Sequence, residues 1–410
     1  MGACCSCHRV SRFEGSSVEE EAKPRDIIDD DNIVLTGEGG ARVRLQGSSK
    51  YVAMHTQQGK KGYNQDAMTV WENFSGEKDA VLCSIFDGHG PNGHMVSRYV
   101  RDYLPAKVTK HYEQSTSYKM DQDCDLNDES NPYFMFWKDR MVRCFHEMDE
   151  ELESDAPVDS YSSGTTSVTV LKKGRDLVVA NLGDSRAVLC TRDSNNEIVA
   201  QQLTVDLKPN LPAEKARITS RRGRVLPMKE EPNVHRIWMP DQDCPGLAMA
   251  RAFGDFCLKD YGLISTPEVT YRRLTDRDEF VVLATDGIWD VLSNSDVIKI
   301  VASARKRSMA AKMLIDEAQR AWRYKFPCAK TDDCAAICLF FKRPRPLLTK
   351  SISQVTQLSI NYKEPHVGNA HDHELETVLN CDMNEDAEKG GDNNRQRRRR
   401  PSRKIEFVGQ

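Results

Sequence analysis

Between residues 51 and 341, short apolar runs alternate with stretches of helical periodicity. Runs rich in Val, Ile, Leu, Ala and Phe predict buried strands at 80–86, 177–182, 280–285 and 335–341, after an earlier strand that begins at Tyr51. Apolar side chains that recur every three or four positions predict helices at 92–104, 294–305 and 308–324. We expect the apolar faces of these elements to pack into one core.

The two ends of the chain are more polar than this middle part. Residues 1–45 combine acidic stretches with glycine clusters, and residues 344–410 are dominated by Asp, Glu, Asn and Arg with few aromatic side chains. Segments of this kind bury too little apolar surface to order themselves. We therefore expect a flexible N-terminal segment at 1–45, a folded domain at 46–343 and a disordered tail at 344–410. The acidic segment 119–132 is expected to be a solvated surface loop.

Charge and composition exclude several classes of protein. The 410 residues contain 58 Lys and Arg against 62 Asp and Glu, which gives a net charge of −4 and disfavours a generally basic nucleic-acid binder. No apolar run approaches the ~18 residues of a membrane span. The 13 cysteines are odd in number and form no small-domain framework, which favours a reducing, intracellular setting. We expect a monomer without a nucleic-acid partner.

Acidic residues stand at the ends of the predicted strands. A single Asp-Gly after a strand usually marks a turn, but strands fix their ends rigidly, so several such acids can converge on one point. Converging carboxylates repel one another unless a cation compensates their charge. Oxygen ligands favour Mg²⁺ or Mn²⁺ over zinc. The positions are Asp66, Asp87, Asp184, Asp286 and Asp333.

Such a cluster suits the hydrolysis of a phosphate ester. Two ions about 3.5–4 Å apart can lower the pKa of a water that attacks phosphorus. His89 lies two positions after Asp87, where it could protonate a leaving alkoxide. Lys60 and Lys61 lie in a glycine-flanked loop, where they could meet a phosphate. From the residues alone, His89 is equally a structural turn histidine, and the two lysines are equally solvated side chains.

At these residues the sequence resembles the metal-dependent serine/threonine protein phosphatases of type 2C, and most of all their plant branch. The resemblance covers residues 50–342 and rests on eight motifs in the order that the family has them. These motifs are Asn64-Gln65-Asp66, Phe86-Asp-Gly-His-Gly90, Ser163-Gly-Thr-Thr166, Asn181-Leu-Gly-Asp-Ser-Arg186, Asp206-Leu-Lys-Pro209, Ala250-Arg-Ala-Phe-Gly-Asp255, Thr285-Asp-Gly-Ile-Trp-Asp290 and Asp332-Asp-Cys334.

The resemblance implies an α+β fold, an αββα sandwich of two antiparallel sheets flanked by helices. It also implies two Mg²⁺ or Mn²⁺ ions per active site. Asp87 resembles the carboxylate that bridges both ions, and Gly88 resembles a backbone carbonyl ligand. Asp286 and Asp333 match the two further acids of the binuclear site, and Asp66 matches an acid that reaches a metal through water.

The resemblance implies roles for other positions as well. Asp184 and Asp290, together with Asp286, match acids of a third and weaker metal position. His89 matches the proposed general acid. The stretch from about 206 to 260 resembles the mobile flap that lies beside the active site and influences substrate choice.

Two positions depart from the family pattern. The family usually has an arginine, which grips the substrate phosphate, where this chain has Lys61. Lysine keeps the positive charge but loses the bidentate fork, so we expect activity with a weaker phosphate affinity. The last motif commonly reads Asp-Asn, and Cys334 replaces the asparagine here. The acid is retained, so this change should matter little.

The N-terminus fits a lipidation signal. Met1-Gly2-Ala-Cys-Cys-Ser6 matches the pattern for N-myristoylation of Gly2, and Cys4 and Cys5 are placed for S-palmitoylation. One myristoyl chain anchors only marginally, and a second lipid makes anchoring stable. We therefore expect the protein on the cytoplasmic face of the plasma membrane, with cytosol or nucleus as alternatives. The basic run 395–404 fits anionic lipid somewhat better than a nuclear localisation signal.

Two functions of different classes remain. The leading hypothesis is an enzyme that hydrolyses phosphoserine and phosphothreonine in phosphorylated protein substrates. The alternative is a membrane-tethered scaffold with a catalytically weak phosphatase fold, which Lys61 and the long tails would permit. A cysteine phosphatase would need a Cys–Arg phosphate loop, and none of the cysteines lies in one.

Overall fold

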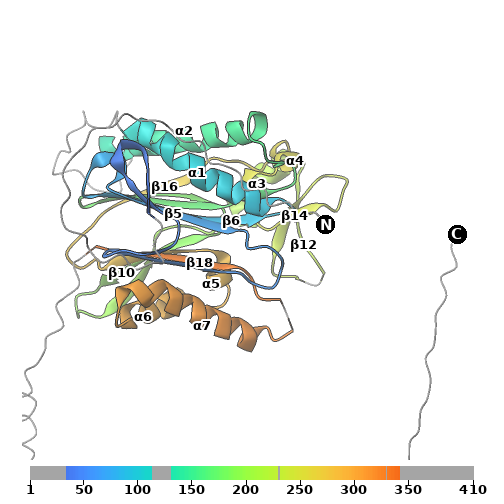
Figure 1. Ribbon diagram of the computed structural model, residues 1–410. Helices are drawn as coiled ribbons and strands as arrows, with labels where there is room; N and C mark the ends of the chain where they lie inside the picture. Colours follow the sequence, from blue (N-terminus) through green and yellow to red (C-terminus); the bar gives the residue numbers. More distant parts are fainter. Residues whose placement is uncertain (1–33, 113–130, 230, 329, 342–410) are drawn as a thin grey trace, which may run out of the picture. The chain divides into compact units, whose positions relative to one another are not determined.

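The computed structural model of the protein describes residues 34–112 and 131–341, except 230 and 329. Two antiparallel sheets lie face to face, with α1 and α2 over one outer face and α5, α6 and α7 over the other (Figure 1). The expected αββα sandwich is confirmed. The helices of the two outer layers are α1 Gly93–Tyr112, α2 Pro132–Ser154, α5 Asp286–Trp289, α6 Asn294–Ser303 and α7 Ala310–Lys325.

The first sheet has the order β1-β2-β5-β6-β8-β9-β16, and β7 and β15 extend it beside β6. All of its pairings are antiparallel. The strands are β1 Val34–Thr36, β2 Arg42–Arg44, β5 Asp66–Glu72, β6 Ala80–His89, β7 Gly164–Thr165, β8 Ser167–Lys173, β9 Asp176–Leu182, β15 Phe253–Gly254 and β16 Glu268–Arg273.

The second sheet has the order β11-β10-β17-β18-β4-β3 and is also antiparallel. Its strands are β3 Gly47–Ser48, β4 Val52–Gln57, β10 Arg186–Arg192, β11 Ile198–Gln202, β17 Phe280–Ala284 and β18 Cys334–Phe340. Short 3-10 turns lie at Glu38–Gly40, Phe74–Gly76 and Arg307–Met309.

Both faces of the central strands are buried, which explains their nearly continuous apolar sequences. In β6, Cys83 and Ile85 point between the two sheets, whereas Leu82 and Phe86 point toward α1 and α2. Burying a side chain of this size stabilises the fold by about 1.5–3 kcal/mol. The strand therefore joins the sandwich centre to one helical layer.

The predicted helices at 92–104, 294–305 and 308–324 are confirmed as α1, α6 and α7. Ser293 caps α6, since its hydroxyl accepts from the backbone N–H of Asp296 and the Asp296 carboxylate accepts in return. Leu314 and Trp322 of α7 pack against the outer face of the second sheet. Among the described residues no helix combines the length and the hydropathy that a membrane span requires.

A smaller subdomain, the flap, spans about 206–260. It contains α3 Pro212–Ser220, α4 Phe256–Lys259 and a three-stranded antiparallel sheet of β12 Arg224–Pro227, β13 His235–Trp238 and β14 Pro245–Leu247. Arg251 joins it to the sandwich: the guanidinium binds both carboxylate oxygens of Glu214 on α3 and the carbonyl of Thr266. The flap thus has its own core and fixed attachments.

The structure corrects two boundaries. Strands β1 and β2 lie inside the segment 1–45, which was expected to be wholly flexible; Ala41 and Val43 are buried in the core that also contains Trp71. Three-residue strands carry no readable periodicity. The expected loop 119–132 ends in a helix, because Asn131 caps α2; residues 119–130 of that loop lie outside the described residues, as do the N-terminal lipidation positions and the tail 344–410.

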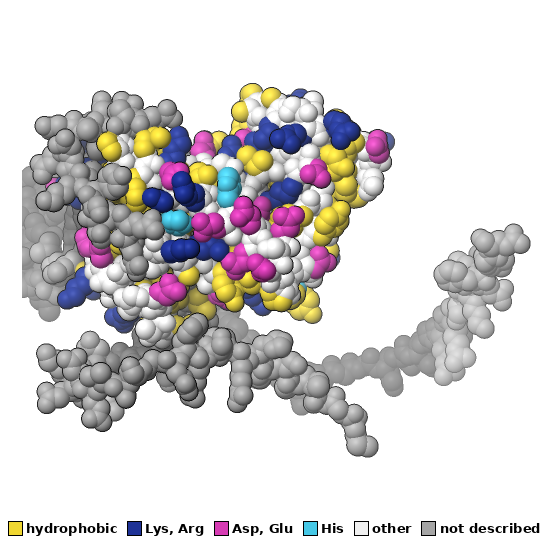
Figure 2. Space-filling view, turned by 90° about the horizontal axis from the view of Figure 1, so that it is seen from above, with side chains coloured by type: hydrophobic (Ala, Val, Ile, Leu, Met, Phe, Trp, Pro, Cys, Tyr) yellow, Lys and Arg dark blue, Asp and Glu magenta, His cyan; other side chains and the backbone are white. Residues whose placement is uncertain are grey.

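The surface carries mixed charge. On the face seen in Figure 2, Lys and Arg side chains lie beside Asp and Glu side chains rather than forming one continuous basic area. The eight cysteines in the described part of the chain are free thiols.

Candidate active site

Strand ends from both sheets line one pocket. Strand β5 begins at Asp66 directly opposite Asp87 near the end of β6. In the second sheet, the end of β17 lies beside the beginning of β18, with Ala284 opposite Ala336. Neighbouring antiparallel strands reverse direction, so the residues after one strand lie beside those before the next. This arrangement brings Asp286, after β17, close to Asp333, before β18.

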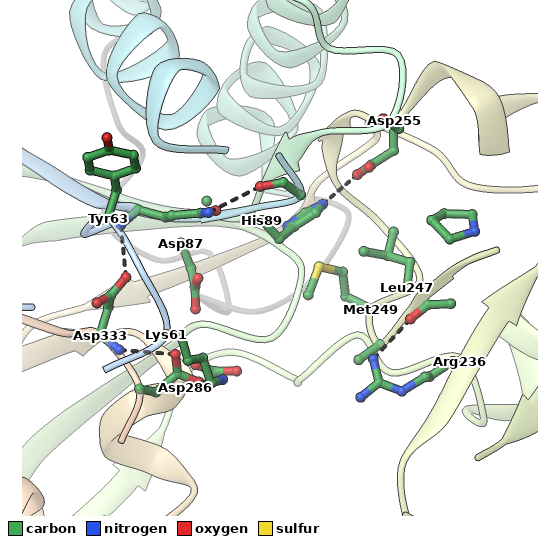
Figure 3. A pocket seen from close by; sticks show the side chains of 18 residues that line it. Lys61, Tyr63, Asp87, His89, Arg236, Leu247, Met249, Asp255, Asp286 and Asp333 are labelled. Atoms are coloured by element: carbon green, nitrogen blue, oxygen red, sulfur yellow. Dashed lines mark hydrogen bonds and ion pairs between the residues drawn. The ribbon is translucent and has the colours of Figure 1, made fainter. Parts of the chain in front are cut away.

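The pocket has a volume of about 410 Å³. In Figure 3, Asp87, Asp286 and Lys61 lie on one side, and flap residues lie on the other. The lining residues are Lys61, Tyr63, Gln65, Asp87, Gly88, His89, Gly90, Ser162, Arg236, Pro245, Gly246, Leu247, Ala248, Met249, Asp255, Asp286, Asp332 and Asp333.

Asp66 links the two sheets. One of its carboxylate oxygens accepts a hydrogen bond from the Thr285 hydroxyl at 2.9 Å. The same hydroxyl oxygen accepts from the backbone N–H of Ala335 at 3.0 Å. Asp66 itself is buried and does not line the pocket. This position behind the pocket fits an acid that reaches a metal only through water.

Asp333 is held by backbone donors. Its two carboxylate oxygens accept from the N–H groups of Gly59 at 2.7 Å and Gln65 at 2.9 Å. The Asp333 carbonyl lies so close to Gly287 that a Cβ there would come within 1.9 Å. Glycine at 287 is therefore needed for the end of β17 to lie against the start of β18.

Gly88 also has no room for a side chain. A Cβ at this position would come within 2.4 Å of the Gly93 carbonyl and 2.7 Å of the Gln65 carbonyl. The glycine permits α1 and the loop before β5 to pack against the end of β6, while the residue still lines the pocket.

These acids resist ionisation. Burial holds the pKa values of Asp66 and Asp87 well above their usual range, and the charges of the neighbouring carboxylates add to this effect, although the hydrogen bond from Thr285 lowers the pKa of Asp66. The same causes raise the pKa of Asp286 to about 8. Carboxylates in this state can all be ionised at neutral pH only when positive charge is brought among them.

His89 is oriented by Asp255. The histidine Nε2 lies 2.5 Å from Oδ2 of Asp255, whose side chain is almost fully buried (Figure 3). Burial lowers the pKa of His89, but the Asp255 carboxylate more than offsets this, so the pKa is raised. The Nδ1 atom is buried and has no hydrogen-bond partner among the described residues. Asp255 ends the motif that begins at Ala250, but the sequence alone indicates no role for this acid.

Lys61 lines the pocket as expected, yet its ammonium group contacts the carboxylate of Asp332. Burial lowers the pKa of Lys61, and the charge and hydrogen bond of Asp332 outweigh that effect and raise it. The lysine is therefore fully charged at neutral pH, but part of its charge is compensated. The sequence places Asp332 beside Asp333 but does not indicate its pairing with Lys61.

Asp184 and Asp290 lie near Lys208, a residue of the Asp206-Leu-Lys-Pro209 motif. The Lys208 ammonium contacts one oxygen of Asp184, and the other oxygen is buried without a partner among the described residues. Burial, and then Asp184, raises the pKa of Asp290, although Lys208 lowers it. The sequence alone does not indicate this contact of Lys208.

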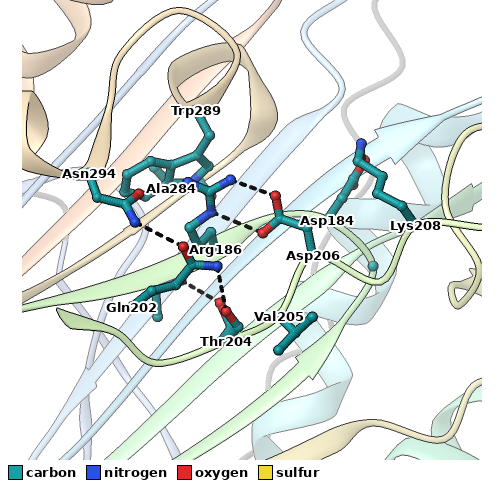
Figure 4. Close-up of polar contacts among 12 residues, drawn as sticks. Asp184, Arg186, Gln202, Thr204, Val205, Asp206, Lys208, Ala284, Trp289 and Asn294 are labelled. Carbon is teal, nitrogen blue, oxygen red and sulfur yellow. Dashed lines mark hydrogen bonds and ion pairs between the residues drawn. The ribbon is translucent and has the colours of Figure 1, made fainter. Parts of the chain in front are cut away.

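A second arginine-centred network fixes the base of the flap (Figure 4). The Arg186 guanidinium binds both carboxylate oxygens of Asp206, at 2.9 and 2.5 Å. It also donates to Asn294 at 2.7 Å and lies over the Trp289 ring, 5.0 Å from its centroid. Asp206 is two positions before Lys208, so this network sets where that lysine lies.

The chemistry of the acids bears on whether they could hold a metal. No three His, Cys, Asp or Glu side chains within the described ranges are spaced as ligands of one ion. The donor set nevertheless fits a hard divalent cation, because the groups are carboxylates whose raised pKa values call for positive charge. Asp184 also keeps a buried oxygen that has no partner in the described part of the chain. The proposed ligand assignment stays a prediction.

Comparisons with known proteins agree with this fold. The sequence model described as "Protein phosphatase 2C" matches residues 50–323. The chain is 53% identical over 356 residues to "Probable protein phosphatase 2C 65" of Arabidopsis thaliana, which covers 84% of this chain and 90% of that protein. It is 50% identical over 366 residues to "Probable protein phosphatase 2C 73" of Oryza sativa subsp. japonica, with coverage of 86% and 82%.

Solved structures show the same likeness. The crystal structure of serine-threonine phosphatase 2C from Toxoplasma gondii superposes with a TM-score of 0.65 at 25% identity, and covers 76% of this chain and 99% of that chain. A Caenorhabditis elegans sex-determining protein shares the fold, with a TM-score of 0.55 at 18% identity. Sequence and structure together place the chain in the protein phosphatase 2C family, in its plant-like branch.

Proposed function

We propose that this protein phosphatase hydrolyses phosphoserine and phosphothreonine in protein substrates, and that it does so with two Mg²⁺ or Mn²⁺ ions. The observation that carries the proposal is the convergence of Asp87, Asp286 and Asp333 on one pocket that His89 also lines. A phosphorylated side chain that enters this pocket would meet the acids and the histidine together.

The residues that would hold the ions follow from the same convergence. Asp87 would be shared between them, and Gly88 would contribute its carbonyl. Asp286 and Asp333 would complete the pair, with Asp66 acting through water. When bound, the ions supply positive charge for the phosphoryl oxygens and acidify the attacking water. A third, weaker position would draw on Asp184, Asp286 and Asp290, and Lys208 competes for Asp184 there.

His89 would supply the proton for the leaving serine or threonine oxygen. Burial lowers the pKa of the ring, but the Asp255 carboxylate outweighs this and raises it, which favours the protonated form. Because Nε2 faces Asp255, Nδ1–H is the group left to donate. Lys61 would contribute charge toward the substrate phosphate, and Asp332 fixes its ammonium group at the pocket wall. Nothing among the described residues favours the alternative of a non-catalytic scaffold.

We further propose that the protein is held at the cytoplasmic face of the plasma membrane by lipids on Gly2, Cys4 and Cys5. The support is the sequence pattern at the N-terminus, which lies outside the described residues. The same proposal includes a monomeric enzyme whose partners are its phosphoprotein substrates.

The test of the catalytic proposal is release of inorganic phosphate from a phosphoserine peptide by the purified full chain. Activity should require added Mn²⁺ or Mg²⁺, and a chelator should abolish it reversibly. Equal phosphate release with and without chelator would contradict the metal-dependent mechanism.

A further inference from the structure

We propose that Arg236 of the flap forms a second anion-binding subsite of the pocket, which takes a carboxylate or phosphate group that the substrate carries close to its phosphorylated residue. This inference rests on the proposed function, because it names a feature of the substrates that the site prefers. It assigns substrate selection to one side chain of the flap.

Arg236 lies on β13, in the three-stranded sheet of the flap, and is the one arginine among the described residues that line the pocket. In Figure 3 it lies across the pocket from Asp87 and Asp286, on the side of Leu247 and Met249. A group bound at Arg236 would therefore be a part of the substrate other than the phosphate that meets the acids.

The guanidinium of Arg236 has donors to spare. One terminal nitrogen donates to the Gly246 carbonyl at 2.9 Å, and the other lies 2.6 Å from a carboxylate oxygen of Glu231. These two contacts use two of the five N–H groups that arginine carries. The Nε atom is buried and has no hydrogen-bond partner among the described residues. Glu231 is about half exposed and does not line the pocket, so the ion pair is accessible to exchange.

The sheet of the flap fixes where Arg236 points. Gly246 has a φ of +76°, and a Cβ at this position would come within 2.6 Å of the Trp238 ring. The Trp238 indole N–H donates to the carbonyl of Leu226 at 2.9 Å. The ring therefore holds β14 and β12 in place, and β14 presents the carbonyl that Arg236 binds. A group positioned in advance loses less entropy when it binds a ligand.

The distribution of charge selects an anion for this side of the pocket. The other two basic side chains that line the pocket are already paired there, Lys61 with Asp332 and His89 with Asp255. On the opposite side, the acids would be taken up by the proposed ions and the reacting phosphate, which leaves Arg236 for a second anionic group of the substrate. An acidic neighbour of the phosphorylated residue is thus favoured at Arg236.

The guanidinium of Arg236 can bind an anion from either of two sources. A carboxylate and a phosphate each present two oxygens that a guanidinium can bind with parallel hydrogen bonds. Glutamate or aspartate in the substrate would supply the carboxylate, and another phosphorylated residue would supply the phosphate.

The experiment measures kcat/KM of the full chain with Mn²⁺ on a series of phosphoserine peptides. One position at a time, from three residues before to three after the phosphoserine, carries glutamine, glutamate or a non-hydrolysable phosphonate analogue of phosphoserine. The decisive quantity is the ratio of kcat/KM for the anionic peptide to that for the glutamine peptide within each form of the enzyme. A general loosening of the flap changes both peptides alike and leaves this ratio unaltered.

For the wild type we expect a ratio of about ten at one or two positions, the size of a hydrogen bond to a charged group. Arg236→Gln should reduce the ratio to about one, and Arg236→Lys should keep part of it. The larger of the glutamate and phosphonate ratios identifies the source. Arg224→Gln is the matched control: Arg224 lies on β12, binds the carbonyls of Met239 and Gln242, and does not line the pocket. It should keep the wild-type ratio.

Two results overturn the inference. They are a wild type without anionic preference and an Arg236→Gln form that keeps the preference. If the Arg236→Gln form keeps the preference while all peptides slow by one common factor, Arg236 would be assigned to the reacting phosphate or to flap folding. Failure of the wild type to hydrolyse any of the peptides with Mn²⁺ would instead overturn the proposed function.

Discussion

His89 and Asp255 are 166 positions apart in the chain, and their side chains meet at 2.5 Å. The contact joins the end of β6 to the residue that follows β15, where Asp255 adopts a left-handed backbone with φ of 52°. The histidine is therefore positioned by a residue at the end of the flap, so the flap and the reacting groups are coupled through one hydrogen bond.

We predict that Asp255→Asn slows hydrolysis of a phosphoserine peptide by about tenfold or more, within the range of general acid catalysis. The asparagine removes the charge that favours the protonated form of His89. Hydrolysis of p-nitrophenyl phosphate should slow less, because p-nitrophenolate leaves without a proton. The measurement is the ratio of kcat for the two substrates. Asp278→Asn, at a buried acid that pairs with Arg272 and does not line the pocket, should not change this ratio. An unchanged ratio in Asp255→Asn would remove the histidine from proton transfer.

Lys61→Ala should raise KM for a phosphopeptide more than it lowers kcat, because the lost charge acts mainly on binding of the ground state. Lys61→Arg should match or exceed the wild type, since a guanidinium can bind two phosphate oxygens. Steady-state kinetics of each form on one phosphopeptide measures KM and kcat. Lys60→Ala is the neighbouring control, as Lys60 is exposed and does not line the pocket. Equal KM values for all four forms would return Lys61 to the role of a solvated lysine.

The stability that Glu214 gives to the attachment of the flap should depend on pH. Burial raises the pKa of Glu214, but hydrogen bonds from Arg251 and Arg217 lower it by a larger amount. The resulting pKa therefore lies below its ordinary value of 4.5. The ionised carboxylate therefore stabilises the fold fully above pH 4.5, and this stability is lost as the pH falls through the lower pKa of the folded protein.

Glu214→Gln should destabilise the protein at neutral pH by about 3 kcal/mol, because it leaves two arginines without their buried partner. The difference from the wild type should shrink as the pH falls below 4.5 and through the lower pKa of the folded protein. Denaturant unfolding at several pH values measures both effects. Asp243→Asn, which breaks the exposed pair with Arg224, is the control and should change little. A pH-independent difference would show that the charge of Glu214 is not the stabilising feature.

Much of the site could be predicted from the sequence because its acids are attached to strong strand signals. The run 80–86 is continuous and apolar, so β6 and the position of Asp87 at its end could be read directly. The same holds for β17 and Asp286. Once the strands are placed, antiparallel pairing limits where their ends can lie. It therefore also limits where the acids at those ends can lie.

The partners of these residues could not be predicted in this way. Asp332, Asp255 and Lys208 each contact a residue from a distant part of the chain, and those contacts depend on the path of the flap and of the loop before β18. The strands of the flap have three or four residues each, too short for a periodic signal. The helix α2 is different, because its apolar stripe from Phe134 to Leu152 and its Asn131 cap are both present in the sequence as helix signals.

The N-terminal signal gives a prediction that is independent of catalysis. Gly2→Ala should prevent myristoylation, and without a first membrane contact also palmitoylation, so this form should be soluble in cells. Cys4→Ser with Cys5→Ser should keep the myristoyl chain and distribute between membrane and soluble fractions, since one chain binds with an association constant of about 10⁴ M⁻¹. Cell fractionation distinguishes the forms. A Gly2→Ala form that stays in the membrane fraction would favour the basic run 395–404 or a bound partner.

We propose that Asp87 is shared by two divalent ions in the pocket. Calorimetric titration of Mn²⁺ into the purified full chain tests this role of Asp87, with wild type and Asp87→Asn compared at equal thermal stability. We expect two tightly bound ions in the wild type, loss of at least one of them in Asp87→Asn, and a fall in turnover by several orders of magnitude. An Asp87→Asn form that binds two ions with wild-type affinity, or a wild type that binds none, would contradict it.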